Sequence, residues 1–254
     1  MVKLNTTDTI PPLRDGDRLT LREFMRRYEA SPEGTRAELL RGVVYLNSSP
    51  VRNGTALDHT MPPIAGGHHA RPQSALNGWL YTYAVHTVGV ESFSPVTTEL
   101  PHSESATEPD LMLRIQAVAG GATTMDEHGY VIGSPELVAE IANTSAATDL
   151  GVKYDTYEAN GVREYLVWRT VPGVLDWFVL KRKKYVPLLP DPADGYLKSV
   201  VFPGLWLDVT ALLAGDGRTV LATLQRGLSS PEHAAFEAKL AATAAKNAKP
   251  KKRK

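Results

Sequence analysis

Apolar residues recur every three or four positions in several stretches of the chain, which is the spacing that buries one side of a helix. A capping-box pattern at Thr20–Glu23 predicts a short helix that ends near Ala30. A longer helix is predicted over about 69–87, where Pro72 suits the first turn. The buried side of this longer helix is expected to consist of Leu76, Trp79, Leu80 and Tyr83.

Two further helices are predicted in the second half of the chain. Residues 148–160 carry Leu150, Tyr154 and Tyr157 at helical spacing, and Gly161 is a natural stop. The alanine-rich residues 231–246 favour a helix by composition.

Short apolar runs separated by turn signals predict strands. Glu38–Leu40 and Val43–Tyr45 flank the turn residues Arg41-Gly42 and predict a hairpin. Further strands are expected at about 91–100, 111–115, 137–142, 162–169, 174–180, 185–189 and 196–201, of which the last four are expected to form two hairpins. Loops are expected over 47–67 and, as an insertion or a poorly ordered segment, over 116–134.

The order of these elements, with helices and strands intermixed, predicts an α+β or α/β-like fold with a mixed sheet. We expect a flexible arm over residues 1–18, one domain over 19–225, and an alanine-rich helix with a basic, disordered tail over 226–254.

One predicted strand and the helix after it both place a charge in apolar surroundings. Because side chains alternate along a strand, Glu140 points away from the side taken by Ala139 and Ile141. Lys153 precedes Tyr157 by four residues, so it shares the buried side of its helix. A carboxylate and an ammonium that both lose water each need a partner of opposite charge or hydrogen bonds.

A second carboxylate, Asp110, follows Pro109 at the start of the predicted strand 111–115. If the strands of Asp110 and Glu140 are neighbours, Lys153 on the adjoining helix completes a set suited to metal-assisted phosphodiester hydrolysis. Carboxylates hold Mg²⁺ while the ion keeps several waters, and the ion lowers the pKa of a bound water. A lysine adds positive charge where the transition state accumulates negative charge. The sequence therefore predicts a phosphodiesterase that depends on Mg²⁺ or Mn²⁺.

Three strings in the chain carry a family resemblance: EPDLML, PELVAEIANTS and DLGVKYDTYEANGVREYLV. With AELLRGVVY and GYLKSVVFPGLWLDVTALL, they make residues 20–213 resemble the Uma-type restriction endonuclease family of the PD-(D/E)XK nuclease superfamily. The resemblance implies a restriction-endonuclease-like mixed central sheet flanked by helices, and it implies DNA as the substrate.

The resemblance also implies roles for four catalytic residues. Asp110 and Glu140 would bind the metal, Lys153 would orient water or stabilise the transition state, and Glu38 would assist as a further ligand or a water-orienting group. The superfamily usually has its lysine two residues after the second acid, where this chain has Ala142. The resemblance therefore implies that the lysine has moved to the following helix.

The histidines give little support to a metal site, because the adjacent His68 and His69 would point in different directions on a helix. The resemblance does place one of them beside the cleft. No nucleophile-elbow pattern and no phosphate-binding glycine loop is present.

Each proposed site residue also has a structural interpretation. Glu140 could pair with an arginine or with backbone donors, Asp110 could cap a strand, and Lys153 could extend along its helix to water. Glu38 could be exposed beside its hairpin turn. Charges such as Asp149 and Asp155 are more typical of solvated positions, and burial in the core is the simpler interpretation of Tyr157. The alternative function is a non-catalytic nucleic-acid-binding or regulatory module, and a hydrolase of small phosphoesters is a third.

Composition changes this picture in two ways. The absence of cysteine excludes disulfides and thiolate chemistry, and the lack of a long apolar run or a signal-peptide pattern predicts a cytoplasmic protein without a membrane span. Six of the 28 basic residues lie in the tail 246–254, which leaves 22 basic against 28 acidic residues, or about −6, in the body. The tail either attracts DNA or is a solvated end.

A homodimer is compatible with cutting both DNA strands, but the sequence does not show one.

Overall fold

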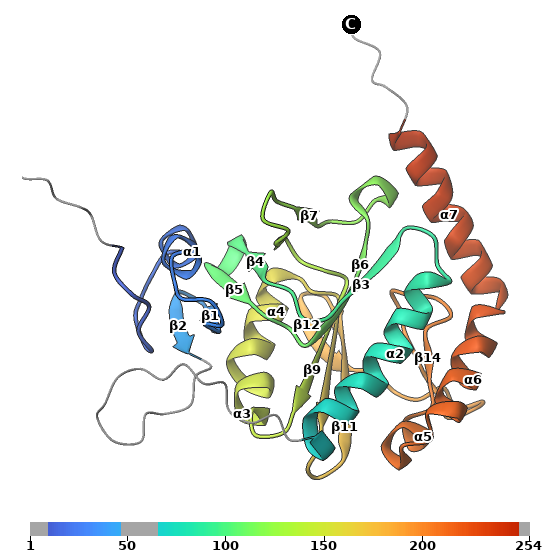
Figure 1. Cartoon of the computed structure of the whole chain (residues 1–254). Coiled ribbons are helices and arrows are strands. Elements are labelled where there is room, and N and C mark those ends of the chain that lie inside the picture. Colours follow the sequence, from blue (N-terminus) through green and yellow to red (C-terminus); the bar gives the residue numbers. More distant parts are fainter. Residues whose placement is uncertain (1–9, 47–65, 249–254) are drawn as a thin grey trace, which may run out of the picture.

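The computed structural model describes residues 10–46 and 66–248, and in these ranges twelve of the fourteen strands form two six-stranded sheets (Figure 1). The central sheet has the strand order β12-β11-β10-β9-β6-β3. Its strands are β3 (Val90–Phe93), β6 (Leu111–Ile115), β9 (Leu137–Ala142), β10 (Glu164–Arg169), β11 (Val174–Lys181) and β12 (Lys184–Pro187). Strand β9 runs parallel to β10 and antiparallel to β6, so the sheet is mixed, as the sequence predicts.

The second sheet has the order β2-β1-β5-β4-β8-β7. Its strands are β1 (Ala37–Leu40), β2 (Val43–Leu46), β4 (Thr98–Leu100), β5 (Ser105–Thr107), β7 (Thr124–Met125) and β8 (Val131–Ile132). A separate short pair consists of β13 (Leu197–Lys198) and β14 (Trp206–Leu207).

Helices cover both faces of the central sheet (Figure 1). The long helices are α1 (Leu21–Glu29), α2 (Arg71–Val85), α4 (Tyr154–Asn160), α5 (Val209–Ala214), α6 (Gly217–Leu228) and α7 (Pro231–Asn247). Shorter turns are α3 (Ala146–Thr148), the π-helical η1 (Gly66–Ala70) and η4 (Asp149–Lys153), and the 3₁₀ turns η2 (Pro101–Ser103) and η3 (Ala117–Ala119). We call the side that carries α2 and α5–α7 the α2 face, and the side that carries α4 and the second sheet the α4 face.

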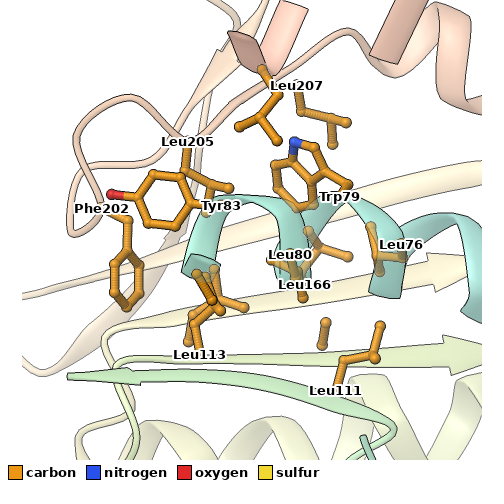
Figure 2. Packing of buried hydrophobic residues seen from close by; sticks show 14 of the residues in the cluster. Leu76, Trp79, Leu80, Tyr83, Leu111, Leu113, Leu166, Phe202, Leu205 and Leu207 are labelled. Atoms are coloured by element: carbon orange, nitrogen blue, oxygen red, sulfur yellow. The ribbon is translucent and has the colours of Figure 1, made fainter. Parts of the chain in front are cut away.

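The α2 face holds the largest apolar core. All four residues of the predicted α2 stripe are completely buried, and they pack against β6, β10 and the segment before α5 (Figure 2). The indole N–H of Trp79 donates to the Trp206 carbonyl at 3.0 Å, and the Tyr83 hydroxyl donates to the Pro203 carbonyl at 2.9 Å. The polar ends of two large aromatic residues are thus satisfied inside the core.

Strand β9 divides its side chains between the two faces as predicted. Leu137, Ala139 and Ile141 belong to the core of the α2 face, whereas Val138 and Ala142 belong to a second core on the α4 face. That second core also contains Tyr157 of α4 and Tyr165 of β10, whose ring centroids are 5.0 Å apart.

Several elements agree with the sequence predictions. Thr20 caps α1 by accepting a hydrogen bond from the Glu23 N–H, and the hairpins β1–β2 and β10–β11 form. Gly161 ends α4 with φ 81°, a conformation that costs glycine little. The alanine-rich segment forms α7, which packs on the core through Leu240.

Other predictions are wrong. The single strand expected over 91–100 is two strands in different sheets, because the chain turns at Ser94-Pro95 and proline cannot donate within a ladder. The segment 116–134 is not only a loop, since β8 pairs in parallel with β4.

The last expected hairpin is also wrong. Strand β12 pairs with β11, and β13 pairs with β14 rather than with β12. Helices α5 and α6 were not predicted from the sequence, although Asp208 and Asp216 cap them by accepting from the Ala211 and Thr219 N–H groups.

The expected domain limits fall differently on the structure. Residues 10–18 lie against the β1–β2 hairpin, with Leu13 buried and the Gly16 N–H donating to the Val44 carbonyl at 2.9 Å. The expected limit after residue 225 falls inside α6. Residues 1–9 of the arm and 249–254 of the tail lie outside the described residues. So does the expected loop 47–67, except for residues 66 and 67 at the start of η1.

Within residues 10–46 and 66–248, none of the helices has the combination of length and apolar character that a membrane crossing requires.

Candidate active site

The first carboxylate pair of the site comes from two neighbouring strands. Strand β6 pairs with β9 in a register that joins Leu111 to Ala139. Asp110, just before β6, accepts the Ile141 N–H on Oδ2 at 2.7 Å, and its own N–H lies 3.4 Å from Glu140 Oε2. Antiparallel pairing therefore brings together two acids that are 30 residues apart in the chain.

The lysine reaches Glu140 from the helical segment that follows β9. Within η4, Gly151 leaves helical geometry with φ −111° and ψ −108°, and α4 begins directly after Lys153. Lys153 Nζ lies 3.1 Å from Glu140 Oε1, which also accepts the Tyr157 hydroxyl at 3.1 Å. Lys153 and Tyr157 are four residues apart, so one side of the helix presents both donors to the same carboxylate.

Glu38 joins the cluster from the second sheet. It lies in β1, is only 2% exposed, and places Oε1 3.1 Å from Lys153 Nζ. The same oxygen accepts the Glu108 N–H at 2.8 Å. The interpretation of Glu38 as an exposed residue beside the hairpin turn is therefore wrong, because all four residues of β1 are buried between the two sheets and α1.

Asp149 is a residue that sequence reasoning missed. It is 2% exposed, its Oδ1 lies 3.8 Å from Lys153 Nζ, and its other oxygen accepts the Ser145 hydroxyl. Its position four residues before Lys153 was the available signal, since residues at this spacing share a helix side. Asp155, considered together with it, is exposed as expected.

We call Glu38, Asp110, Glu140 and Asp149 together with Lys153 the acidic cluster. Burial alone would lower the pKa of the Lys153 ammonium, but Glu140 and Glu38 raise that pKa well above its usual value, so the lysine remains protonated. Burial raises the pKa of Glu140, and Lys153 opposes this shift without cancelling it. Four carboxylates thus share one ammonium.

Burial also raises the pKa values of Asp110 and Asp149. The Ile141 N–H and His69 oppose the shift at Asp110, and Lys153 and the Ser145 hydroxyl oppose it at Asp149. A surplus of carboxylates over cations in a buried place is the electrostatic setting that a divalent cation relieves.

The cluster opens toward solvent at Asp110. The Asp110 side chain is 23% exposed, and His69 of η1 places Nε2 3.6 Å from Asp110 Oδ1 with 27% of its side chain exposed. The side chains of Glu38, Glu140 and Lys153 are at most 8% exposed. Within the part of the chain that the structure describes, the cluster is therefore accessible from the side of Asp110 and His69.

The donor set fits a partly hydrated cation better than a closed protein cage. Among the residues that the structure describes, no group of three or more metal-binding side chains converges as a ready metal site. Asp110 and Glu140 each keep an oxygen outside the short hydrogen bonds, Oδ1 and Oε2 respectively. Mg²⁺ commonly uses one or two carboxylates and retains its waters, so these two residues suit it.

A mixed sheet flanked by helices, in a chain that intermixes helices and strands, makes this a mixed α+β fold. The chain matches the Uma2 family, described as "Putative restriction endonuclease", over residues 50–210, and it belongs to this family. The family and the fold make the protein nuclease-like.

A solved structure supports the fold assignment. A crystal structure described as a "putative nuclease belonging to DUF820" from Anabaena variabilis ATCC 29413 is similar over 78% of this chain and 98% of that chain. The TM-score is 0.51 and the sequence identity is 15%, so the likeness concerns the fold. Among curated proteins, none matches this chain.

Proposed function

We propose that this protein is an endonuclease that hydrolyses DNA phosphodiester bonds with Mg²⁺ or Mn²⁺. The observation that carries the proposal is the convergence of Asp110, Glu140 and Lys153, which come from three separate segments of the chain. Membership of a restriction endonuclease family supports DNA as the substrate.

Asp110 and Glu140 are the proposed metal ligands. A bound Mg²⁺ or Mn²⁺ would polarise a phosphate oxygen and lower the pKa of a bound water. Because the Lys153 ammonium stays protonated, it supplies positive charge beside Glu140, where a phosphate would gain negative charge. Glu38 holds this ammonium from the opposite sheet.

The first test measures cleavage of supercoiled plasmid in Mg²⁺ or Mn²⁺. Wild type should nick the plasmid, and Asp110→Asn, Glu140→Gln and Lys153→Met should each lower the rate about 100- to 1000-fold. Two variants serve as matched controls and should leave the rate unchanged: Asp155→Asn on the same helix and Lys184→Met, whose side chain is 77% exposed.

The second test separates metal binding from activity. Mg²⁺ should raise the thermal unfolding midpoint of wild type, since a ligand at about 100 times its Kd stabilises the folded state by about 2.7 kcal/mol. Asp110→Asn and Glu140→Gln should lose most of this increase, whereas Asp155→Asn should keep it. An equal increase in all four proteins would place the ion elsewhere.

The main alternative is a non-catalytic nucleic-acid-binding or regulatory module. It predicts DNA binding without cleavage in either metal. A truncation after Ala245 tests the basic tail in both cases, because a tail that contacts phosphates makes DNA binding fall more steeply with salt. An unchanged salt slope would assign the tail no role in binding.

A further inference from the structure

The Glu140 carboxylate uses its two oxygens differently. Oε1 accepts hydrogen bonds from the Lys153 ammonium and the Tyr157 hydroxyl, each at 3.1 Å. Oε2 lies 3.4 Å from the backbone nitrogen of Asp110. Two donors therefore occupy one oxygen, and the other oxygen lies beside the second proposed metal ligand.

The two donors at Oε1 are not equivalent. The Lys153 ammonium also lies 3.1 Å from Glu38 Oε1 and 3.8 Å from Asp149 Oδ1, so three carboxylates share it. The Tyr157 hydroxyl has one proton and donates it to Glu140. An ammonium that moves toward a phosphate would weaken its bond to Glu140, and Tyr157 would then be the donor that keeps Oε1 in place.

The ring of Tyr157 is packed on all sides, which fixes the place of its hydroxyl. Tyr157 has no exposed surface and lies in the middle of α4, in the core of the α4 face with Val138 and Val162. Its ring centroid is 5.0 Å from that of Tyr165. The terminal torsion of a glutamate is broad by comparison, so its two oxygens can exchange places. The direction of the Glu140 carboxylate therefore depends on its donors, of which Tyr157 is the rigid one.

Two other tyrosines of the same core show what a structural hydroxyl does there. The Tyr165 hydroxyl donates to the Asp149 backbone carbonyl at 2.9 Å. The Tyr185 hydroxyl donates to the Val162 backbone carbonyl, also at 2.9 Å. Both bonds hold one segment of the chain against another. The Tyr157 hydroxyl differs, because its acceptor is the side chain of a proposed metal ligand.

We propose that Tyr157 is a positioning residue whose hydroxyl holds Glu140 so that Oε2 is left for a Mg²⁺ or Mn²⁺ ion shared with Asp110. This rests on the proposed function, because it takes Glu140 and Asp110 as the metal ligands. Groups that hydrogen-bond a metal ligand orient it, and losing one such group typically weakens metal binding about 10- to 100-fold. In this role the hydroxyl contacts neither the ion nor the substrate, and it acts through Glu140.

The test measures Mn²⁺ binding to full-length protein without DNA, through the electron paramagnetic resonance signal of the free ion. Asp110→Asn defines which bound Mn²⁺ belongs to the site. Tyr157→Phe keeps the ring and removes the hydroxyl, so it should bind Mn²⁺ at this site about 10- to 100-fold more weakly than wild type. Tyr185→Phe is the matched control, because it removes a buried hydroxyl and its hydrogen bond from the same core, and it should bind Mn²⁺ as wild type does. Unchanged affinity in Tyr157→Phe would overturn the proposal.

A second variant tests whether the donor, and not the shape of the side chain, is responsible. Replacing Tyr157 by 4-aminophenylalanine restores an N–H donor at the same ring position. This variant should recover most of the Mn²⁺ affinity that Tyr157→Phe loses. A loss that persists in it, or an equal loss in Tyr185→Phe, would mean that the change disturbs the packing of the core and would overturn the proposal.

The two proposals can fail separately. Plasmid cleavage by a protein whose Mn²⁺ affinity does not change in Tyr157→Phe would overturn only the role of Tyr157. A loss of affinity in Tyr157→Phe, in a protein that never cleaves DNA, would overturn only the endonuclease. A wild type that binds no Mn²⁺ would overturn the metal ligands on which both proposals depend.

Discussion

Glu164 and Glu140 are buried carboxylates on the neighbouring strands β10 and β9, and they point to opposite faces of the central sheet. Glu164 belongs to the α2 face, where its oxygens accept the Val200 and Val201 N–H groups at 2.7 and 3.0 Å and the Ser199 hydroxyl at 2.7 Å. All of these donors are uncharged, and we call them the neutral cradle of Glu164. Glu140 belongs to the α4 face and meets the charged groups of the acidic cluster.

The difference separates a structural carboxylate from one available for chemistry. The Glu164 oxygens accept hydrogen bonds from uncharged donors, and these bonds hold the segment 199–201 against β10. The oxygens of Glu140 face an ammonium, a phenol and further acids, an arrangement whose charge a cation can rebalance. Burial raises the pKa of both, but at Glu140 the neighbouring acids add to the shift.

The largest expected effect on stability lies on the α2 face. Trp79→Ala should lower the free energy of unfolding by about 3 to 5 kcal/mol, because it removes a fully buried indole and its hydrogen bond to the Trp206 carbonyl. Urea denaturation at neutral pH measures the change. Tyr81→Ala, on the same helix with 59% exposure, is the control and should change stability by less than about 0.5 kcal/mol. A small loss at Trp79 would mean that the α2 face is not the main source of stability.

The second effect is a change in stability with pH that arises at Glu164. Burial raises the pKa of Glu164 to about 6, against an ordinary value of 4.5. A carboxyl with a raised pKa in the folded state contributes stability below about pH 4.5, and this contribution is lost as the pH rises through about 6. A rise in pKa from 4.5 to about 6 corresponds to about 2 kcal/mol.

Glu164→Gln should therefore remove a pH-dependent difference of about 2 kcal/mol between pH 4 and pH 7, relative to wild type. Urea denaturation at a series of pH values gives the difference between the two proteins at each pH. Glu33→Gln, at an exposed position, is the control for replacing a surface glutamate. A constant difference between wild type and Glu164→Gln across this range would contradict the raised pKa.

The same comparison explains which features the sequence could predict. The stripe of α2 and the alternation of β9 follow from local periodicity, so the burial of Trp79 and the direction of Glu140 could be predicted. The chemistry of Asp110, Glu140 and Lys153 could be proposed because each is a charge inside a local apolar pattern.

The remaining features depend on contacts that no local pattern contains. Glu38 is buried only because β1 pairs with β5 and its carboxylate meets Lys153, more than a hundred residues further along the chain. Asp149 turns inward on a segment that Gly151 distorts. The partner of β12 is decided by the sheet edge that β11 leaves open, not by the spacing of its own apolar residues.

The smallest expected effect on stability is at Glu140. Glu140→Gln should leave the free energy of unfolding within about 1 kcal/mol of wild type at neutral pH, or raise it, because the buried Lys153 ammonium keeps Glu38 and Asp149 as charged partners. The amide oxygen can still accept from Lys153 and Tyr157, while the repulsion from Asp149, Asp110 and Glu38 falls. Urea denaturation, run beside Trp79→Ala, measures it. A loss as large as that of Trp79→Ala would mean that the acidic cluster stabilises the fold. The acidic cluster would then be structural, like the hydrogen bonds of Glu164, and would not be a functional site that lowers stability.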